Sequence, residues 1–154
     1  MALLAGLQRA EGVTTVATRT VRVVAALIPG RLDAQRFLVQ QRLPGGSRAL
    51  LWEFPGGKVE AGETDEAALA RECREELDVE LSVGRRLWEG RHEYPDLTVE
   101  LVLYAARMLS GEPKPLGANA LEFRTPGEMQ SLPFCEADIP LLEELVAGRL
   151  GALD

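Results

Sequence analysis

The stretch from Gly57 to Val79 constrains this chain of 154 residues more than any other part of it. It reads GKVEAGETDEAALARECREELDV and continues a glycine-rich turn that begins at Pro55. We predict a helix that begins near Thr64. Its last two turns carry three glutamates: Glu72, Glu75 and Glu76. Because positions i, i+3 and i+4 share one face of a helix, the three carboxylates project to the same side.

Three carboxylates on one face repel one another, and like charges at this spacing weaken an isolated helix. A cation among them would offset the repulsion, and hard oxygen ligands suit Mg²⁺ or Mn²⁺ better than zinc. The alternative interpretation is a solvated acidic helix face, which is the usual explanation of a glutamate-rich helix. The spacing of the neighbouring residues bears on this choice.

The residues of this stretch follow a fixed order: Gly57, five residues, Glu63, seven residues, Arg71-Glu72, two residues, Glu75-Glu76. This order resembles the signature box of the Nudix hydrolases and favours the metal interpretation. One position departs from the family's pattern, since Asp78 stands where the family usually has glycine. Glycine there would end the helix in a left-handed conformation, which aspartate also adopts at modest cost.

Other segments resemble the MutT-like branch of the family: WEFPGGKVE at residues 52–60, Tyr94-Pro95-Asp96, and Leu132-Pro133 leading to Ala137-Asp138-Ile139-Pro140. The resemblance implies an α/β fold, a Nudix-type α/β/α sandwich with a mixed β-sheet. A single Nudix hydrolase domain is expected over residues 15–150. Residues 1–14 carry no clear pattern and are predicted to be an N-terminal extension.

Strand patterns precede and follow the motif helix. Strands are predicted at residues 15–28, 36–42, 79–88, 91–94, 97–109 and 121–124. The first two are expected to pair as a hairpin. A helical turn at residues 126–130 and an amphipathic helix at 137–147 close the chain. Strands, a helix, strands and a closing helix indicate a mixed sheet covered on two sides.

The composition excludes several classes of function. The net charge of −7 argues against a nucleic-acid polymer as a partner, because no basic stripe is present to contact phosphates. No apolar run approaches the ~20 residues of a membrane span, and the N-terminus lacks the features of a signal peptide. With only two cysteines, the chain is predicted to be a reduced, cytoplasmic protein, either a monomer or a homodimer.

The resemblance implies metal binding, by Mg²⁺ with Mn²⁺ as a substitute, at five residues: Gly56, Gly57, Glu72, Glu75 and Glu76. The glycines would let backbone carbonyls approach the ions with no side chain in the way. Arg71 is predicted to hold Glu75 in place, and Glu63 to do similar structural or outer-shell work. Some MutT-like enzymes carry a further glutamate before the last short strand, but that place falls at Gly117 here. The general base is then expected to be Glu72 or Glu76.

Five residues are candidates for binding the substrate: Arg42, Lys58, Phe54, Tyr94 and Asp138. Arg42 and Lys58 would contact phosphates, unless they are ordinary surface cations. Phe54 and Tyr94 would stack on a base, although aromatic residues beside a turn more often belong to the core. Asp138 stands where a MutT enzyme selective for oxidised guanine has asparagine, and an ionised aspartate only accepts hydrogen bonds. Its alternative role is the N-cap of the closing helix, with Pro140 in the first turn.

These observations favour an Mg²⁺-dependent hydrolase that converts (deoxy)nucleoside triphosphates to monophosphate and pyrophosphate. The expected substrates are 8-oxo-dGTP or cytidine-type nucleotides, and the role is sanitation of the nucleotide pool. Two alternatives stay open. One is a Nudix hydrolase of another nucleoside diphosphate-X compound, such as a nucleotide sugar or a dinucleoside polyphosphate. The other is a non-catalytic Nudix module that binds a nucleotide.

Overall fold

A computed structural model describes residues 19–153 of the chain. The predicted extension at residues 1–14 and the first residues of the strand predicted from Thr15 lie outside this range. The strands are β1 (Thr20–Leu27), β2 (Phe37–Gln41), β3 (Trp52–Glu53), β4 (Gly56–Lys58), β5 (Glu80–Glu93), β6 (Thr98–Ser110) and β7 (Ala120–Arg124). The helices are α1 (Asp65–Leu77), α2 (Pro126–Met129), the 3₁₀ turn η1 (Glu136–Asp138) and α3 (Ile139–Val146).

The strands form two sheets. The larger sheet has the order β4-β1-β6-β5, in which β1 and β6 are parallel and the other pairs antiparallel. The smaller sheet is antiparallel, with the order β3-β2-β7. The residues predicted as two strands at 79–88 and 91–94 form the single strand β5, with register shifts between Val83 and Trp88. The expected mixed sheet is therefore present, and a second sheet accompanies it.

The predicted hairpin between the first two strands is wrong. β1 and β2 belong to different sheets, and the link between their ends is an isolated bridge from Pro29, just after β1, to Phe37, the first residue of β2. A strand has two edges for backbone pairing, and β4 and β6 occupy both edges of β1. β2 instead pairs with β3 and β7, which come later in the chain.

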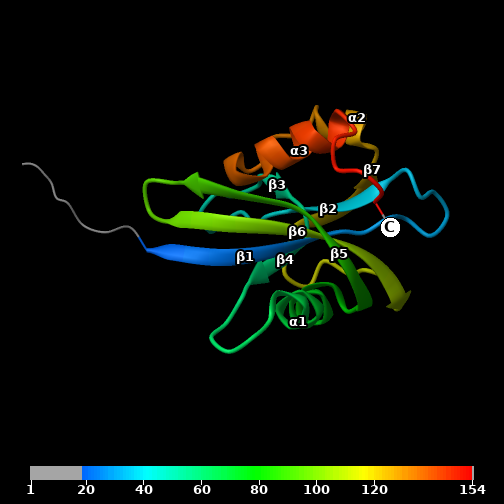
Figure 1. Cartoon of the computed structure of the whole chain (residues 1–154), viewed down its shortest axis with the longest axis horizontal. Coiled ribbons are helices and arrows are strands. Elements are labelled where there is room, and N and C mark those ends of the chain that lie inside the picture. Colours follow the sequence, from blue (N-terminus) through cyan, green and yellow to red (C-terminus); the bar gives the residue numbers. More distant parts are fainter. Residues whose placement is uncertain (1–18, 154) are drawn as a thin grey trace, which may run out of the picture.

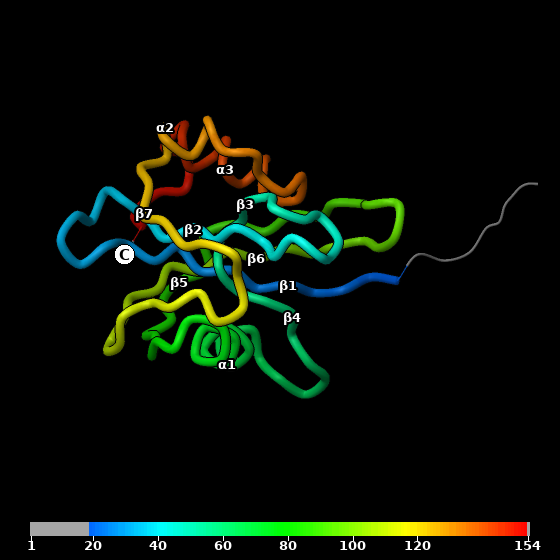
Figure 2. Tube along the Cα trace, turned by 180° about the vertical axis from the view of Figure 1, so that it is seen from behind, coloured from blue at the N-terminus to red at the C-terminus, as the bar shows by residue number. Residues whose placement is uncertain are grey.

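Helices cover the sheets from two sides. α1 lies on one side, and α2 and α3 lie on the other (Figure 1, Figure 2). Alternate residues of β1 serve the two cores: Val24 and Ala26 pack with the α1 side, and Ala25 and Leu27 with the α3 side. This arrangement confirms the predicted α/β/α sandwich with a mixed sheet.

The ends of α1 position the motif. Thr64 is the N-cap, and its hydroxyl accepts a hydrogen bond from the backbone N–H of Ala67 at 3.1 Å. Asp78 ends the helix in the left-handed conformation, with φ of 58°, and its N–H donates to the carbonyl of Arg74. Aspartate therefore adopts the conformation expected of glycine at this position. The helix buries its apolar side and leaves its glutamates beside the sheet edge.

The closing helix begins with a short 3₁₀ turn. Its predicted range, 137–147, divides into η1 and α3, and Leu141, Leu142 and Leu145 are buried as expected. Among residues 19–153, no helix is long and apolar enough to cross a membrane.

Candidate active site

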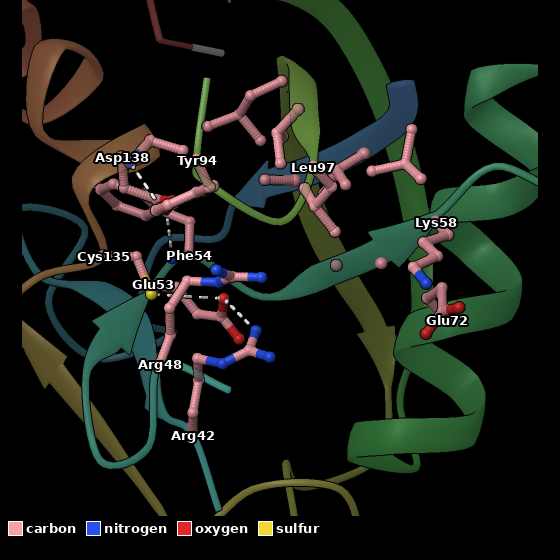
Figure 3. Close-up of a pocket in the computed structure, with 18 of the residues that line it drawn as sticks. Arg42, Arg48, Glu53, Phe54, Lys58, Glu72, Tyr94, Leu97, Cys135 and Asp138 are labelled. Carbon is pink, nitrogen blue, oxygen red and sulfur yellow. Dashed lines mark hydrogen bonds and ion pairs between the residues drawn. The ribbon is translucent and has the colours of Figure 1, made fainter. Parts of the chain in front are cut away.

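A cavity of about 400 Å³ lies between the glycine turn, α1 and the segment before α3 (Figure 3). Glu72 and Glu76 line one end of it, and Tyr94 and Asp138 line the other. Three cations also border it: Arg42, Arg48 and Lys58. A second cavity of about 610 Å³ adjoins the first, shares Arg42, Glu53, Gly56 and Glu76 with it, and reaches Gly117. The cavity therefore has two ends. We call the end with Glu72 and Glu76 the acidic end, and the end with Tyr94 and Asp138 the base end.

Arg71 organises the acidic end. It donates to Glu63 through Nε and Nη2, at 2.7 and 2.9 Å, and its Nη1 donates to Glu72 at 3.1 Å and to Glu75 at 3.2 Å. A further bond joins its Nη2 to the carbonyl of Lys58. These hydrogen bonds from the guanidinium lower the pKa of Glu63 to about 2. Arg71 thus ties the loop before α1, the glycine turn and the glutamates together.

The three motif glutamates differ in their surroundings. The side chain of Glu72 is only 17% exposed, and burial raises its pKa, with the charges of Glu76 and Glu75 adding to the effect. Glu76 is partly buried and lines both cavities. Glu75 is 56% exposed, is held by Arg71, and lines neither cavity. The carboxylates that face the cavities are therefore those of Glu72 and Glu76.

Two glycines let the backbone lie directly against these carboxylates. A Cβ on Gly57 would stand 2.3 Å from the carboxyl carbon of Glu72, and a Cβ on Gly117 would stand 1.4 Å from Oε1 of Glu76. The first approach brings the turn to the motif helix, as expected for Gly57. The second approach places Gly117, the position where some MutT-like enzymes carry a further glutamate, next to Glu76.

The acidic end fits a divalent metal ion in its donor set. Within residues 19–153, no three His, Cys, Asp or Glu side chains are already gathered as a metal site. However, Glu72 and Glu76 line one cavity together with the Gly56–Gly57 backbone, and all of these donors are oxygens. Burial raises the pKa of Glu72, and the neighbouring carboxylates of Glu76 and Glu75 add to the rise. Hard oxygen donors with excess negative charge are the set that Mg²⁺ and Mn²⁺ prefer.

Glu53 is a functional candidate that the sequence analysis missed. Its Oε2 accepts a hydrogen bond from Gln40 at 3.0 Å, and its Oε1 accepts one from Arg42 at 3.1 Å. It lines both cavities. The missed signal was the alternation Trp52-Glu53-Phe54, in which a carboxylate between two buried aromatics points away from their core.

Asp138 stands at the N-cap position of α3, with Pro140 in the first turn as predicted, but its side chain makes no capping hydrogen bond. Asp138 is 5% exposed, and its carboxylate accepts a hydrogen bond from the backbone N–H of Phe54 at 3.1 Å. It therefore fastens the closing segment to the chain that enters the glycine turn. Burial raises the pKa of Asp138 to about 8, with the nearby charge of Glu53 adding to the shift.

The remaining predicted substrate residues border the same cavity (Figure 3). Arg42 is partly buried and paired with Glu53, and Lys58 is exposed on β4. Phe54 and Tyr94 are buried, at 3% and 7% exposure, so both belong to the core as well as to the cavity wall. The hydroxyl of Tyr94 accepts a hydrogen bond from the N–H of Ala137 at 2.9 Å.

Comparisons with known proteins agree with this fold. The protein-family model described as NUDIX domain matches residues 25–144, and the chain belongs to the Nudix family, as a MutT-like Nudix hydrolase. It is 37% identical over 131 residues to the CTP pyrophosphohydrolase of Escherichia coli (strain K12), covering 85% of this chain and 95% of that protein. It is 32% identical over 124 residues to the 8-oxo-dGTP diphosphatase of the same organism, with coverage of 80% and 92%.

A solved structure shares both fold and sequence with the chain. The solution structure of the E. coli ORF135 protein superimposes with a TM-score of 0.71 at 35% identity, covering 86% of this chain and 92% of that one. The predicted resemblance to MutT-like Nudix hydrolases is therefore confirmed. The family's general use of a divalent metal ion agrees with the donor set at the acidic end.

Proposed function

We propose that the protein hydrolyses nucleoside triphosphates to a nucleoside monophosphate and pyrophosphate, with Mg²⁺ as its metal ion. One observation carries the proposal: a single cavity joins Glu72 and Glu76 to the base-sized hollow beside Tyr94 and Asp138. Relatives named as a CTP pyrophosphohydrolase and an 8-oxo-dGTP diphosphatase support the substrate class.

The acidic end would hold the metal ion and the phosphates. Glu72, Glu76 and the backbone carbonyls of Gly56 and Gly57 would bind Mg²⁺, which neutralises phosphate charge and activates water when bound. Arg71 keeps Glu72 and Glu75 oriented and Glu63 ionised. In the reaction, the oxygen of water bonds to the β-phosphorus while the bond from that phosphorus to the α–β bridging oxygen breaks. Glu72 or Glu76 accepts the proton of the water.

The other end would bind the base. With a pKa of about 8, Asp138 carries a proton at neutral pH, so its carboxyl group offers an O–H donor as well as an acceptor. The proposed group thus differs from the ionised aspartate expected from the sequence, which would only accept hydrogen bonds. A protonated carboxyl group can donate its O–H to a ring nitrogen and accept from the neighbouring amino group. Cytosine and adenine both present such a ring nitrogen beside an amino group. The glutamate neighbour, Glu53, would favour the amino group further.

A nucleotide panel with product analysis tests the proposal. CTP, dCTP, 8-oxo-dGTP, ATP, a nucleotide sugar and a dinucleoside polyphosphate are each incubated with the protein and Mg²⁺ in H₂¹⁸O. The proposal predicts fastest turnover of a triphosphate, with ¹⁸O in the pyrophosphate and none in the monophosphate. Label in the monophosphate would overturn the attack at β-phosphorus. Faster turnover of the sugar or the dinucleotide would favour the diphosphate-X alternative, and binding with no turnover would favour the non-catalytic module.

A further inference from the structure

The loop between β2 and β3 contains backbone strain beside the cavity. Arg48 and Leu50 both have positive φ, at 55° and 63°, although neither is glycine. Side chains adopt this left-handed region at a cost, and such residues cluster at sites that bind ligands. Arg48 is the one of the two that lines the cavity.

Three contacts hold the guanidinium of Arg48 in place. Its Nη1 and Nη2 donate to the two carboxylate oxygens of Asp96 at 3.2 and 3.3 Å. Its Cζ lies 4.1 Å from the centre of the Tyr94 ring. The side chain is 19% exposed and points into the pocket beside Arg42 (Figure 3). The planar guanidinium is therefore fixed along one edge by two hydrogen bonds to the Asp96 carboxylate and on one face by the Tyr94 ring.

The aromatic rings expected to stack on a base are themselves covered. Arg48 occupies one face of Tyr94, and His92 packs edge-on against that ring at 4.5 Å. Phe54 is 3% exposed and packs on Phe134 at 5.7 Å. The Arg48 guanidinium is a further planar group at this end of the cavity, and its side chain is 19% exposed, whereas the residues Phe54 and Tyr94 are buried. The guanidinium of Arg42 is more exposed, at 34%, but it is paired with Glu53 and no aromatic ring among residues 19–153 backs it.

We propose that Arg48 binds the nucleobase, which stacks on the guanidinium face turned away from Tyr94. This inference rests on the proposed function, since it takes the occupant of the cavity to be a nucleotide. Arginine planes stack on bases much as aromatic rings do, and the charge adds to the attraction. Tyr94 backs the plane and Asp96 keeps it from rotating, so little side-chain freedom is lost on binding. Arg48 is thus a base-binding residue of this chain.

Substitutions separate a stacking plane from a point charge. Arg48→Ala and Arg48→Lys are both expected to raise KM for the best nucleotide about 10- to 100-fold, with kcat within about threefold of the wild type. Lysine fails because it keeps the charge and loses the plane. Asp96→Ala is the matched control: it removes the ion pair but leaves the guanidinium on Tyr94, and KM should rise at most about threefold. Melting temperatures show that each variant is folded.

Three outcomes would overturn the proposal. A wild-type KM in Arg48→Lys would mean that only charge matters, and a wild-type KM in Arg48→Ala would mean that Arg48 does not bind substrate. An equal rise in Arg48→Ala and Asp96→Ala would mean that Arg48 merely clamps the loop. Calorimetric titration with CMP and dGMP repeats the comparison without turnover. If the wild type hydrolyses no triphosphate, the proposed function fails, while the CMP and dGMP affinities of wild type and variants still decide the role of Arg48.

Discussion

The two ends of the cavity are built in opposite ways. At the acidic end, Glu63, Arg71, Glu72 and Glu76 lie within one loop and one helix, and Arg71 contacts two of the three carboxylates directly. At the base end, Glu53, Tyr94 and Asp138 come from three segments far apart in the chain. A site within one helix has its geometry set by helical spacing, whereas the other exists only after the sheets have formed.

The same chemical group behaves differently at the two ends. The pKa of Glu63 falls to about 2 because a guanidinium donates to it, and the pKa of Asp138 rises to about 8 because burial is incompletely compensated. The ionised Glu63 holds Arg71 beside the metal-facing glutamates. A protonated carboxyl at the other end suits hydrogen bonding to a neutral base.

The largest expected effect is the loss of turnover when a carboxylate is removed from the acidic end. Glu72→Gln and Glu76→Gln should each lower kcat by at least about 100-fold, because each removes a carboxylate from the metal-facing wall. Their melting temperatures should stay close to that of the wild type, since the amide is nearly isosteric. Glu66→Gln, on the exposed first turn of α1, is the control and should keep full activity. Turnover within a few-fold of wild type in both site variants would remove Glu72 and Glu76 from the catalytic site.

A second substitution tests the contact between Gly117 and Glu76. Gly117→Ala puts a methyl group where Oε1 of Glu76 now lies, so the carboxylate must move. We expect kcat to fall about 10- to 100-fold, because a displacement of about 1 Å at a reacting site has effects of this size. Gly127→Ala, where a Cβ meets nothing within 4 Å, is the matched control. Equal activity of the two variants would show that the position of Glu76 is unimportant.

A third substitution tests the raised pKa of Asp138 at the base end through the pH dependence of stability. Asp138 binds its proton more tightly folded than unfolded, so the free energy of unfolding should fall as pH rises from about 4 to about 8. Asp138→Asn can still accept the Phe54 N–H bond and carries no charge. Its melting temperature should exceed that of the wild type by several degrees at pH 8, and by much less at pH 5. A difference independent of pH would contradict the raised pKa of Asp138. Base preference, measured on the same variant, should be largely retained, because the amide of asparagine offers a donor and an acceptor as the protonated carboxyl group does.

The smallest effect concerns Glu63. Because its folded pKa lies below its unfolded value, its ionisation stabilises the fold above about pH 4.5, and this contribution is lost as pH falls toward 2. Glu63→Gln should therefore melt about 1–3 °C below the wild type at pH 7, and at the same temperature near pH 2. Thermal melts by circular dichroism at the two pH values make the comparison. An undiminished gap at low pH would mean that the charge of Glu63 is not what stabilises the fold.

The contrast between the two ends also explains which features could be predicted from the sequence and which could not. The bounds of α1, the left-handed Asp78 and the contacts of Arg71 with Glu75 all follow from local spacing. The hairpin was wrong because pairing of β1 depends on β6, about 80 residues later. Arg48 was missed for the same reason, since only the folded chain brings it to Tyr94 and Asp96. Glu53 was missed although the local alternation Trp52-Glu53-Phe54 marked it.

Metal binding by the acidic end tests the account most directly. Titration of Mn²⁺ followed by electron paramagnetic resonance measures it without any substrate, in the wild type, in the Glu72→Gln/Glu76→Gln double variant and in Asp138→Asn. We expect the double variant to bind Mn²⁺ at least about tenfold more weakly, and Asp138→Asn to bind it as the wild type does. Equal Mn²⁺ affinity in the wild type and the double variant would contradict the assignment of metal binding to α1.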